Sequence, residues 1–169
     1  MKIYRDTKNK GAVNMAVDEY LMLQSAAENE IIWRFSGPKN CVYLGYFQSA
    51  EQELDLAKCH ADKIDVIRRQ TGGGAVYSDS ELTYSVCIPL GHPFLKSMGV
   101  RESYEQIIKI IIKGLKGLGI NATFKPLNDI LVDGKKISGN AQTRRHGVLL
   151  QHGTLLMDVD VEKMFSYLK

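Results

Sequence analysis

The sequence lacks the residues that would cross-link the chain or hold a structural metal. Its three cysteines, Cys41, Cys59 and Cys87, are odd in number and widely spaced, which suits a reducing cytoplasm better than a disulfide framework. The four histidines are scattered, and no CxxC or HxxxH pair occurs. A structural zinc site is therefore not expected, and we predict no metal ligands and a cytoplasmic location.

Long apolar runs and a strong charge imbalance are also missing. The longest apolar runs, such as 110–112, are far shorter than a membrane span, and the N-terminus has no apolar signal-peptide core. The net charge is only +3, from 22 basic and 19 acidic residues, which is too small to indicate nucleic-acid binding. At 169 residues, 44% hydrophobic and 24% charged, the chain is typical of one globular domain with neither a membrane nor a nucleic-acid partner.

The strongest local signal is the segment 68–77, which reads RRQTGGGAVY. Three successive glycines cost backbone entropy on folding, so a functional reason for them is expected. Free N–H groups with φ > 0 can form an anion-binding nest, and the forked donors of Arg68 and Arg69 suit carboxylate or phosphate. The segment matches neither a Walker loop nor a GxGxxG motif. We predict a ligand loop rather than a simple hairpin tip.

Hydrophobic periodicity predicts two long helices and several strands. The first helix spans Met15 to Ala27 with Asn14 as N-cap, and the second spans Arg101 to Leu118 with apolar residues at i, i+3, i+4 and i+7. A turn at Ser36-Gly37-Pro38 is expected to join the first two strands. The predicted strands are Ile31–Phe35, Cys41–Tyr46, Asp65–Arg69, Leu82–Ile88 and Val148–Met157.

An antiparallel hairpin follows the second helix. Asp133-Gly134 lies between two apolar-alternating runs, which is a strong signal for a two-residue hairpin turn. A second return is expected near 145–147, and a further helix begins after an aspartate cap at Asp160. This order predicts an α+β fold with a mixed, largely antiparallel sheet and flanking helices.

Lys136 is the main candidate for chemistry. It follows the hairpin turn on a strand, which can aim its ammonium within a narrow range, whereas Lys135 points to the opposite face and is expected in solvent. Asn128 and Asp129 either bind a ligand or shape the turn. A lone histidine in a strand, as at His152, is more often structural than catalytic.

Together these segments resemble the lipoate–protein ligase A family, within the biotin and lipoate ligase and lipoyl transferase superfamily. The resemblance covers nearly the whole chain, and the pairing of the glycine loop with the KISG hairpin is its most specific part. The matching segments are 14–19 (NMAVDE), 44–48 (LGYFQ), 68–76 (RRQTGGGAV), 82–85 (LTYS), 128–142 (NDILVDGKKISGNAQ) and 151–156 (QHGTLL).

The resemblance implies a catalytic domain of the class II synthetase-like fold and a two-step reaction. Lipoate and ATP, with Mg²⁺, would give lipoyl-AMP, and a lysine of an acceptor domain would then attack it. By analogy Lys136 is catalytic, and strand alternation suggests Val42, Leu44, Tyr46 and Val76 for the acyl slot. The implied substrate- and adenylate-binding residues are Arg69, Thr71, Gly72, Gly73, Gly74, Ala75, Val76, Tyr77, Asn128, Asp129, Ile137, Ser138, Gly139, Ala141 and His152.

The resemblance also implies protein partners. They are the lipoyl-accepting domains of 2-oxoacid dehydrogenase E2 subunits or the glycine cleavage H protein. Residues 1–169 are expected to be the catalytic domain, with the family's C-terminal accessory domain absent, truncated or supplied by a separate chain. Ser78 departs from the pattern, because many relatives carry histidine there.

Three other functions remain open. An octanoyl or lipoyl transferase of the same fold would use a cysteine acyl-enzyme shortly before the hairpin, but 120–127 (INATFKPL) contains no cysteine. Biotin ligases have an arginine-interrupted glycine loop, which this chain lacks. A non-catalytic paralogue that binds acyl-adenylate is disfavoured by Lys136 and the intact glycine loop.

Overall fold

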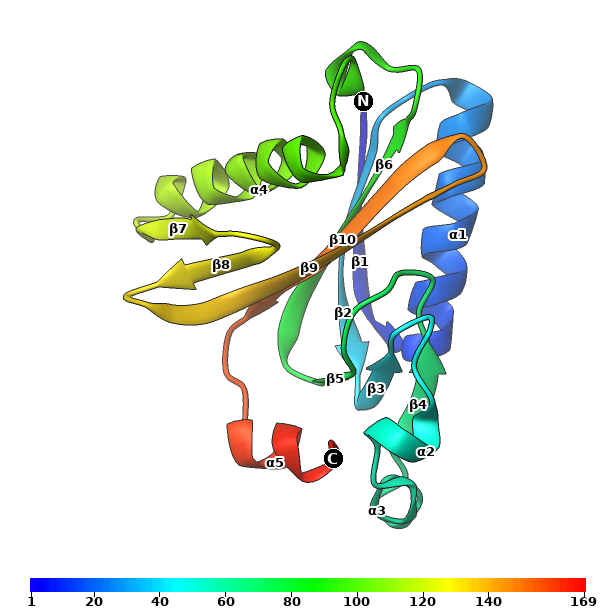
Figure 1. Cartoon of the computed structure of the whole chain (residues 1–169), viewed down its shortest axis with the longest axis vertical. Helices are drawn as coiled ribbons and strands as arrows, with labels where there is room; N and C mark the ends of the chain where they lie inside the picture. Colours follow the sequence, from blue (N-terminus) through cyan, green and yellow to red (C-terminus); the bar gives the residue numbers. More distant parts are fainter.

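The computed structural model describes all of residues 1–169 and contains two sheets (Figure 1). The strands of the main sheet lie in the order β1 (Lys2–Lys10), β2 (Ile32–Lys39), β6 (Glu81–Pro89), β10 (Val148–Leu156), β9 (Lys135–Arg145), β8 (Asp129–Val132) and β7 (Ala122–Lys125). The small sheet has the order β4 (Asp65–Arg68), β3 (Cys41–Leu44) and β5 (Val76–Ser78). Only β1–β2 and β3–β4 pair in parallel, so the predicted mixed, largely antiparallel α+β fold is confirmed.

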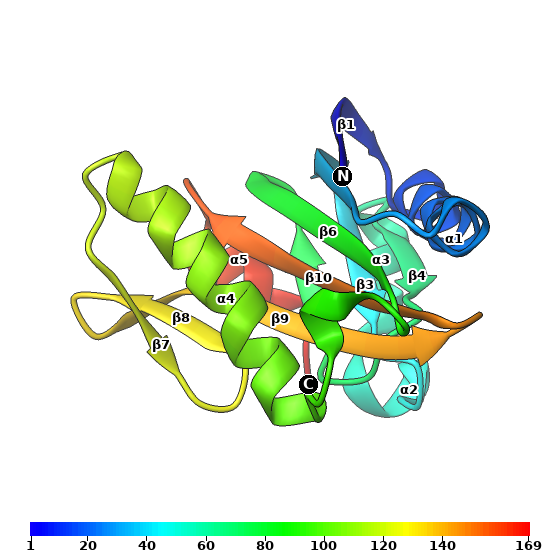
Figure 2. The ribbon, with the colours of Figure 1, turned by 90° about the horizontal axis from the view of Figure 1, so that it is seen from above.

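Two long helices cover opposite faces of the main sheet (Figure 2). Val86 and Ile88 of β6 pack in the cluster that includes Ile107 and Ile111 of α4 (Val100–Gly117). Cys87, between them, packs instead in the cluster formed with α1 (Gly11–Glu28). Successive strand residues point to opposite faces, so this alternation places the sheet between the two helices.

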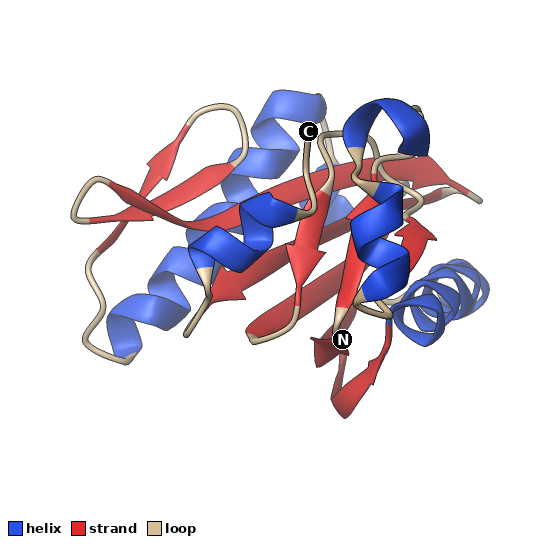
Figure 3. Cartoon of the chain, turned by 90° about the horizontal axis from the view of Figure 1, so that it is seen from below, coloured by secondary structure: helices blue, strands red, loops and turns tan.

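Shorter helices accompany the small sheet. They are α2 (Ala50–Glu53), α3 (Leu56–Ala61) and α5 (Val161–Ser166), and a 3-10 turn, η1 (Pro93–Leu95), precedes α4. The segment after α5 docks by Tyr167, whose ring stacks on Tyr77 of β5 with centroids 5.0 Å apart. Seen from below, α5 lies in front of the main sheet (Figure 3). None of the helices is long and apolar enough to cross a membrane.

Several local predictions are confirmed. The Asp133-Gly134 hairpin joins β8 to β9, the second return joins β9 to β10, and Asp160 caps α5 by accepting a hydrogen bond from the Lys163 N–H at 2.9 Å. The second long helix differs from its prediction by one residue at each end.

Other local predictions are wrong. Asn14 is not an N-cap, because α1 begins at Gly11 and the Asn14 side chain is buried inside the molecule. The segment 36–38 does not form a turn but continues β2 as far as Lys39. Strands β1 and β7 were not predicted. Both lie at the edges of the main sheet. β1 lacks an alternation of apolar residues, and β7 alternates over only four residues, which is too short for periodicity to reveal it.

Candidate functional site

One large cavity, of about 740 Å³, opens between the glycine loop, the β8–β9 hairpin, β10 and α5. Its polar side includes Lys136, Asn128 and His152. Its apolar side includes the side chains Val76, Leu156, Val161, Met164, Phe165 and Leu168. A cavity of this size with an apolar wall and a few converging polar groups is the usual form of a small-molecule site.

Arg69 fills the inside of the glycine loop. Its Nη2 donates to the carbonyl oxygens of Gly72 and Gly74 at 2.6 and 2.9 Å, and its Nη1 donates to the Tyr43 carbonyl at 3.2 Å. Gly73 adopts φ +95°, a conformation in which a larger residue would be strained. The three glycine N–H groups have no acceptor within the protein, so they remain free to bind an anion.

Lys136 reaches the cavity from the start of β9, as predicted. Its Nζ lies 2.8 Å from Oδ1 of Asp129 on β8, and its side chain is about half exposed. Gly139 lies under the lysine, because a Cβ built there would stand 3.3 Å from Nζ. The hairpin thus holds a cation at the cavity while leaving it accessible.

A second polar network supports the hairpin. The Tyr84 hydroxyl donates to Oδ1 of Asn140 and accepts a hydrogen bond from Nε2 of Gln151. Asn128 and Asn140 each donate from their side chain to the other's backbone carbonyl, at 2.6 and 2.8 Å. Asn128 therefore shapes the chain before β8 and also borders the cavity. The alternation pattern did not reveal Tyr84 or Gln151, because polar residues in a strand normally face solvent.

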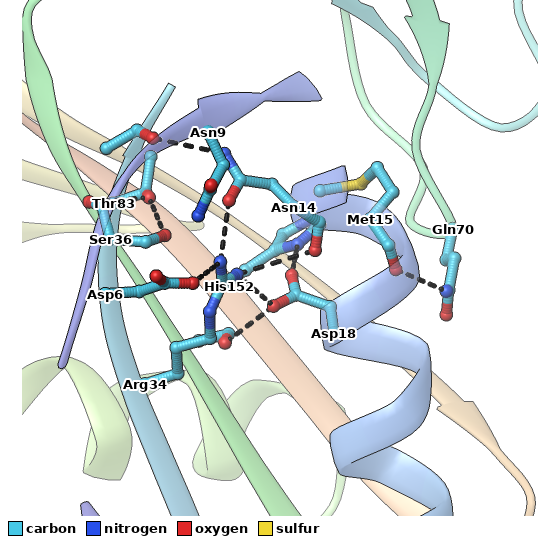
Figure 4. A network of polar contacts seen from close by, with 12 residues as sticks. Asp6, Asn9, Asn14, Met15, Asp18, Arg34, Ser36, Gln70, Thr83 and His152 are labelled. Carbon is cyan, nitrogen blue, oxygen red and sulfur yellow. Dashed lines mark hydrogen bonds and ion pairs between the residues drawn. The ribbon is translucent and has the colours of Figure 1, made fainter. Parts of the chain in front are cut away.

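A buried ion cluster borders the cavity beside α1 (Figure 4). Arg34 on β2 is 3% exposed. It donates to Oδ1 of Asp18 at 3.3 Å, to Oδ2 of Asp6 at 2.8 Å and to Oδ1 of Asn14 at 2.7 Å. The hydrogen bond from Arg34 holds the pKa of Asp6 below its usual range. The cluster was not predicted as part of the site. The sequence features that could have revealed it are an arginine, Arg34, within a largely apolar strand and an aspartate, Asp18, on a face of the first helix.

His152 joins this cluster to the glycine loop. Its Nδ1 lies 3.2 Å from Oδ2 of Asp18, and its Nε2 lies 2.7 Å from the Thr71 hydroxyl. That hydroxyl also accepts a hydrogen bond from Nε of Arg69 at 3.1 Å. Both ring nitrogens of His152 are therefore engaged by the protein, as expected for a structural histidine, although the ring also borders the cavity.

The structure brings most of the predicted site residues together. Those that border the cavity are Lys136, Arg69, Gly72, Gly73, Gly74, Ala75, Val76, Asn128, Gly139, Ala141 and His152. Five others do not border it. Thr71 is fully buried, Asp129 pairs with Lys136, Tyr77 packs on Tyr167, Ile137 packs against the core beneath α4, and Ser138 is buried beside Asn140.

The acyl slot predicted from strand alternation is largely wrong. Val42 and Leu44 are buried in the core of the small sheet, and the ring of Tyr46 lies under the guanidinium of Arg145 at 4.3 Å. Of the four residues, only Val76 borders the cavity. The apolar wall comes instead from β10 and from α5, which is far away in the sequence.

No cysteine borders the cavity. All three are buried, and burial raises the pKa of the Cys41 thiol to about 12. Burial likewise raises the pKa of Cys87 and of Cys59. Because the thiolate is the reactive form, these cysteines have the character of small core residues.

The protein's own side chains form no ready-made metal site. No group of three or more His, Cys, Asp or Glu side chains is placed to hold a metal ion. Mg²⁺ in nucleotide sites is commonly held by one or two carboxylates together with substrate phosphates. Near the cavity Asp129 would be such a carboxylate, but its Oδ1 already faces Lys136.

Comparison with known proteins agrees with this geometry. Residues 10–169 match the model of the lipoyl protein ligase A/B catalytic domain. Octanoyltransferase LipM from Macrococcus caseolyticus is 39% identical over 185 residues, which cover 94% of this chain and 66% of that protein. The chain thus spans about two thirds of the length of this curated relative. Its name agrees better with the transferase alternative than with ATP-dependent ligation.

Solved structures of ligases also resemble the chain. A bipartite lipoate protein ligase from Thermoplasma acidophilum, described with its E2 lipoyl domain, superposes with a TM-score of 0.82 at 29% identity, covering 99% of this chain and 66% of that one. Lipoate–protein ligase A bound with ATP gives 0.80 at 29% identity, covering 100% and 72%. These structures support the fold and the family.

Proposed function

Because the chain belongs to the lipoyl protein ligase A/B catalytic domain family, we propose that it transfers an octanoyl or lipoyl group to a lysine of an acceptor protein. The observation that carries the proposal is the juxtaposition in one cavity of an apolar wall, the free N–H groups of the glycine loop and the Lys136 ammonium. An eight-carbon acyl chain suits the apolar wall. Its activated carboxyl suits the cationic, N–H-lined side.

Transfer requires an amine to attack the acyl carbonyl. A C–N bond forms, the bond to the leaving group breaks, and negative charge develops on the carbonyl oxygen. Donors fixed in advance at that point supply much of the rate enhancement in such reactions. Lys136, paired with Asp129, and the loop N–H groups are the donors available in this cavity. The proton lost by the amine leaves with the leaving group or enters solvent.

The acyl donor separates two versions of the proposal. Octanoyl transfer is supported by the names of relatives at 36–40% identity. In this version the acyl donor we propose is a carrier-protein thioester. All three cysteines are buried and none borders the cavity, so no thiol is placed to carry the acyl group in this version. The amine of the acceptor would attack the carrier thioester directly, without a covalent acyl-enzyme.

ATP-dependent ligation through an acyl-adenylate is the second candidate. The uninterrupted glycine loop with free N–H groups favours it, since such a nest suits a phosphate. So does the similarity to a ligase bound with ATP. In this version the loop and Lys136 would hold the phosphate of the adenylate, and AMP would be the leaving group.

Intact-mass spectrometry of an acceptor domain tests both versions. An apo lipoyl domain or glycine cleavage H protein would be incubated with the enzyme and one of three acyl sources: octanoyl carrier protein, octanoyl-AMP, or octanoate with ATP and Mg²⁺. Modification from the carrier alone identifies a transferase, and modification from free acid with ATP identifies a ligase. An acceptor left unmodified by all three sources would refute the proposed function.

A further inference from the structure

The role of Arg69 follows from what its guanidinium contacts. It is 8% exposed, and burial lowers its pKa. It donates to the carbonyls of Tyr43, Gly72 and Gly74 and to the Thr71 hydroxyl. A guanidinium has five N–H groups, and these four contacts use most of them. Although Arg69 borders the cavity, it has little capacity left to bind a ligand.

The two glycine carbonyls determine where the loop's N–H groups point. In a planar trans peptide the carbonyl and the following N–H point in opposite directions. With the carbonyls of Gly72 and Gly74 aimed at Arg69, the N–H groups of Gly73 and Ala75 point away from the guanidinium. Neither N–H has an acceptor in the protein, and both residues border the cavity.

We propose that Arg69 is a positioning residue that aims the Gly73 and Ala75 N–H groups into the cavity, and that Thr71, His152 and Asp18 hold it there. The part concerning catalysis rests on the proposed acyl transfer. The chain of contacts runs from Asp18 of α1 to His152 of β10, then to Thr71 and Arg69. It links the donors of the loop to the buried cluster beside α1.

The Thr71 hydroxyl connects Arg69 to His152 because it can accept one hydrogen bond and donate another. The hydroxyl accepts a hydrogen bond from Nε of Arg69, so its own hydrogen is free to bond Nε2 of His152. That arrangement leaves the Nδ1 hydrogen of His152 for the Asp18 carboxylate. Asp18 is in turn held by Arg34 and Ser85, at 3.3 and 2.8 Å.

Two substitutions test the proposal without depending on activity. Arg69→Lys keeps a positive charge but loses the fork, and Thr71→Val removes the hydroxyl at nearly constant volume, with Thr71→Ser as its rescue. Backbone ¹⁵N order parameters of residues 72–75 are the readout. We expect roughly 0.85 in the wild type and in Thr71→Ser, and below about 0.6 in Arg69→Lys and Thr71→Val. Unchanged order parameters in both would overturn the proposal.

Arg68 provides a matched control. It is the neighbouring arginine, but its Nη1 donates to the carbonyls of Gly45, Tyr46 and Gln48 rather than to the glycine loop. Arg68→Lys should therefore loosen residues 45–48 and leave 72–75 ordered. Equal loosening of 72–75 by Arg68→Lys would contradict a specific role for Arg69.

Transfer kinetics supply the readout for catalysis. Arg69→Lys should lower kcat by about 10²-fold, the usual effect of losing one oxyanion donor, with KM for the acceptor domain unchanged. A raised KM for the acyl donor at wild-type kcat would instead assign Arg69 to direct ligand binding and refute its positioning role. If the wild type transfers nothing while Arg69→Lys still disorders the loop, the proposed function fails and the positioning role stands.

Discussion

Replacing Gly45 by alanine would test whether the position of the glycine loop matters for activity. Gly45 follows β3 and lies against the loop. A Cβ built on it would overlap the carbonyl oxygen of Gly73 and stand 3.0 Å from its carbonyl carbon. Both atoms belong to the backbone and cannot rotate away. Because Cβ atoms rarely come within 3.0 Å of other heavy atoms, the Gly73 peptide has to move by about 1 Å, or the β3 end has to yield.

The cost can be estimated from general magnitudes. Overpacking in a well-packed region costs about 1–3 kcal/mol, so Gly45→Ala should lower the free energy of unfolding by that amount. A misplacement of about 1 Å near reacting groups costs on the order of 10²-fold in rate. We therefore expect a folded variant with its kcat reduced about a hundredfold.

Gly74→Ala is the matched control. Gly74 lies in the glycine loop that Gly45 packs against, has no positive φ, and a Cβ built there meets no atom within 4 Å. Its stability should change by no more than about 0.4–1 kcal/mol, in the stabilising direction, since alanine restricts the unfolded chain. Urea denaturation would measure both variants, alongside transfer kinetics. Equal stability and equal kcat for the two variants would refute the steric argument.

Three further variants test separate features of the protein. Lys136→Ala should abolish acyl transfer with less than about 0.5 kcal/mol change in stability, because the side chain is half exposed; wild-type turnover would contradict its catalytic role. A variant with Cys41, Cys59 and Cys87 changed to alanine should still transfer acyl groups, although it should be less stable than the wild type. A folded but inactive variant, together with a thioester trapped on the wild type, would instead support a mechanism with a cysteine acyl-enzyme. Glu81→Gln tests a buried carboxyl that is 5% exposed and whose pKa is raised by burial. The folded state binds the Glu81 proton more tightly than the unfolded state, so this carboxyl costs stability as pH rises above its unfolded pKa of 4.5. Denaturation from pH 4 to 7 should show Glu81→Gln gaining stability over the wild type as pH rises; a constant difference would refute it.

The parts of the site that were predictable depend on local sequence. The hairpin turn at Asp133-Gly134 sets the register that brings Lys136 to the cavity beside Asp129. The glycine loop is recognisable from composition alone, because three successive glycines have few uses other than a close approach of the backbone to a ligand or to another segment. In both cases the candidate residues for the chemistry lie within a few positions of the residues that shape the backbone.

The apolar wall of the cavity was not predictable, because it depends on packing between distant segments. Strand alternation placed Val42 and Leu44 in the predicted acyl slot. Both residues are on β3, which belongs to the separate small sheet, and both side chains are buried in the core of that sheet. The wall is completed by residues of α5 such as Met164, and Tyr167, directly after α5, packs on Tyr77 of β5. Periodicity within one segment carries no information about such contacts.

The same limit applies to the arginines of the glycine loop, and it changes what their presence means. From the sequence, Arg68 and Arg69 looked like ligand-binding cations. In the structure each one donates mainly to backbone carbonyls, Arg68 beneath 45–48 and Arg69 inside 72–74. A glycine-rich loop is entropically costly to order, and several charge-assisted hydrogen bonds from one buried arginine can offset that cost. The two arginines are therefore occupied by the backbone, and the N–H groups of the loop and Lys136 remain the candidate groups for binding an anion.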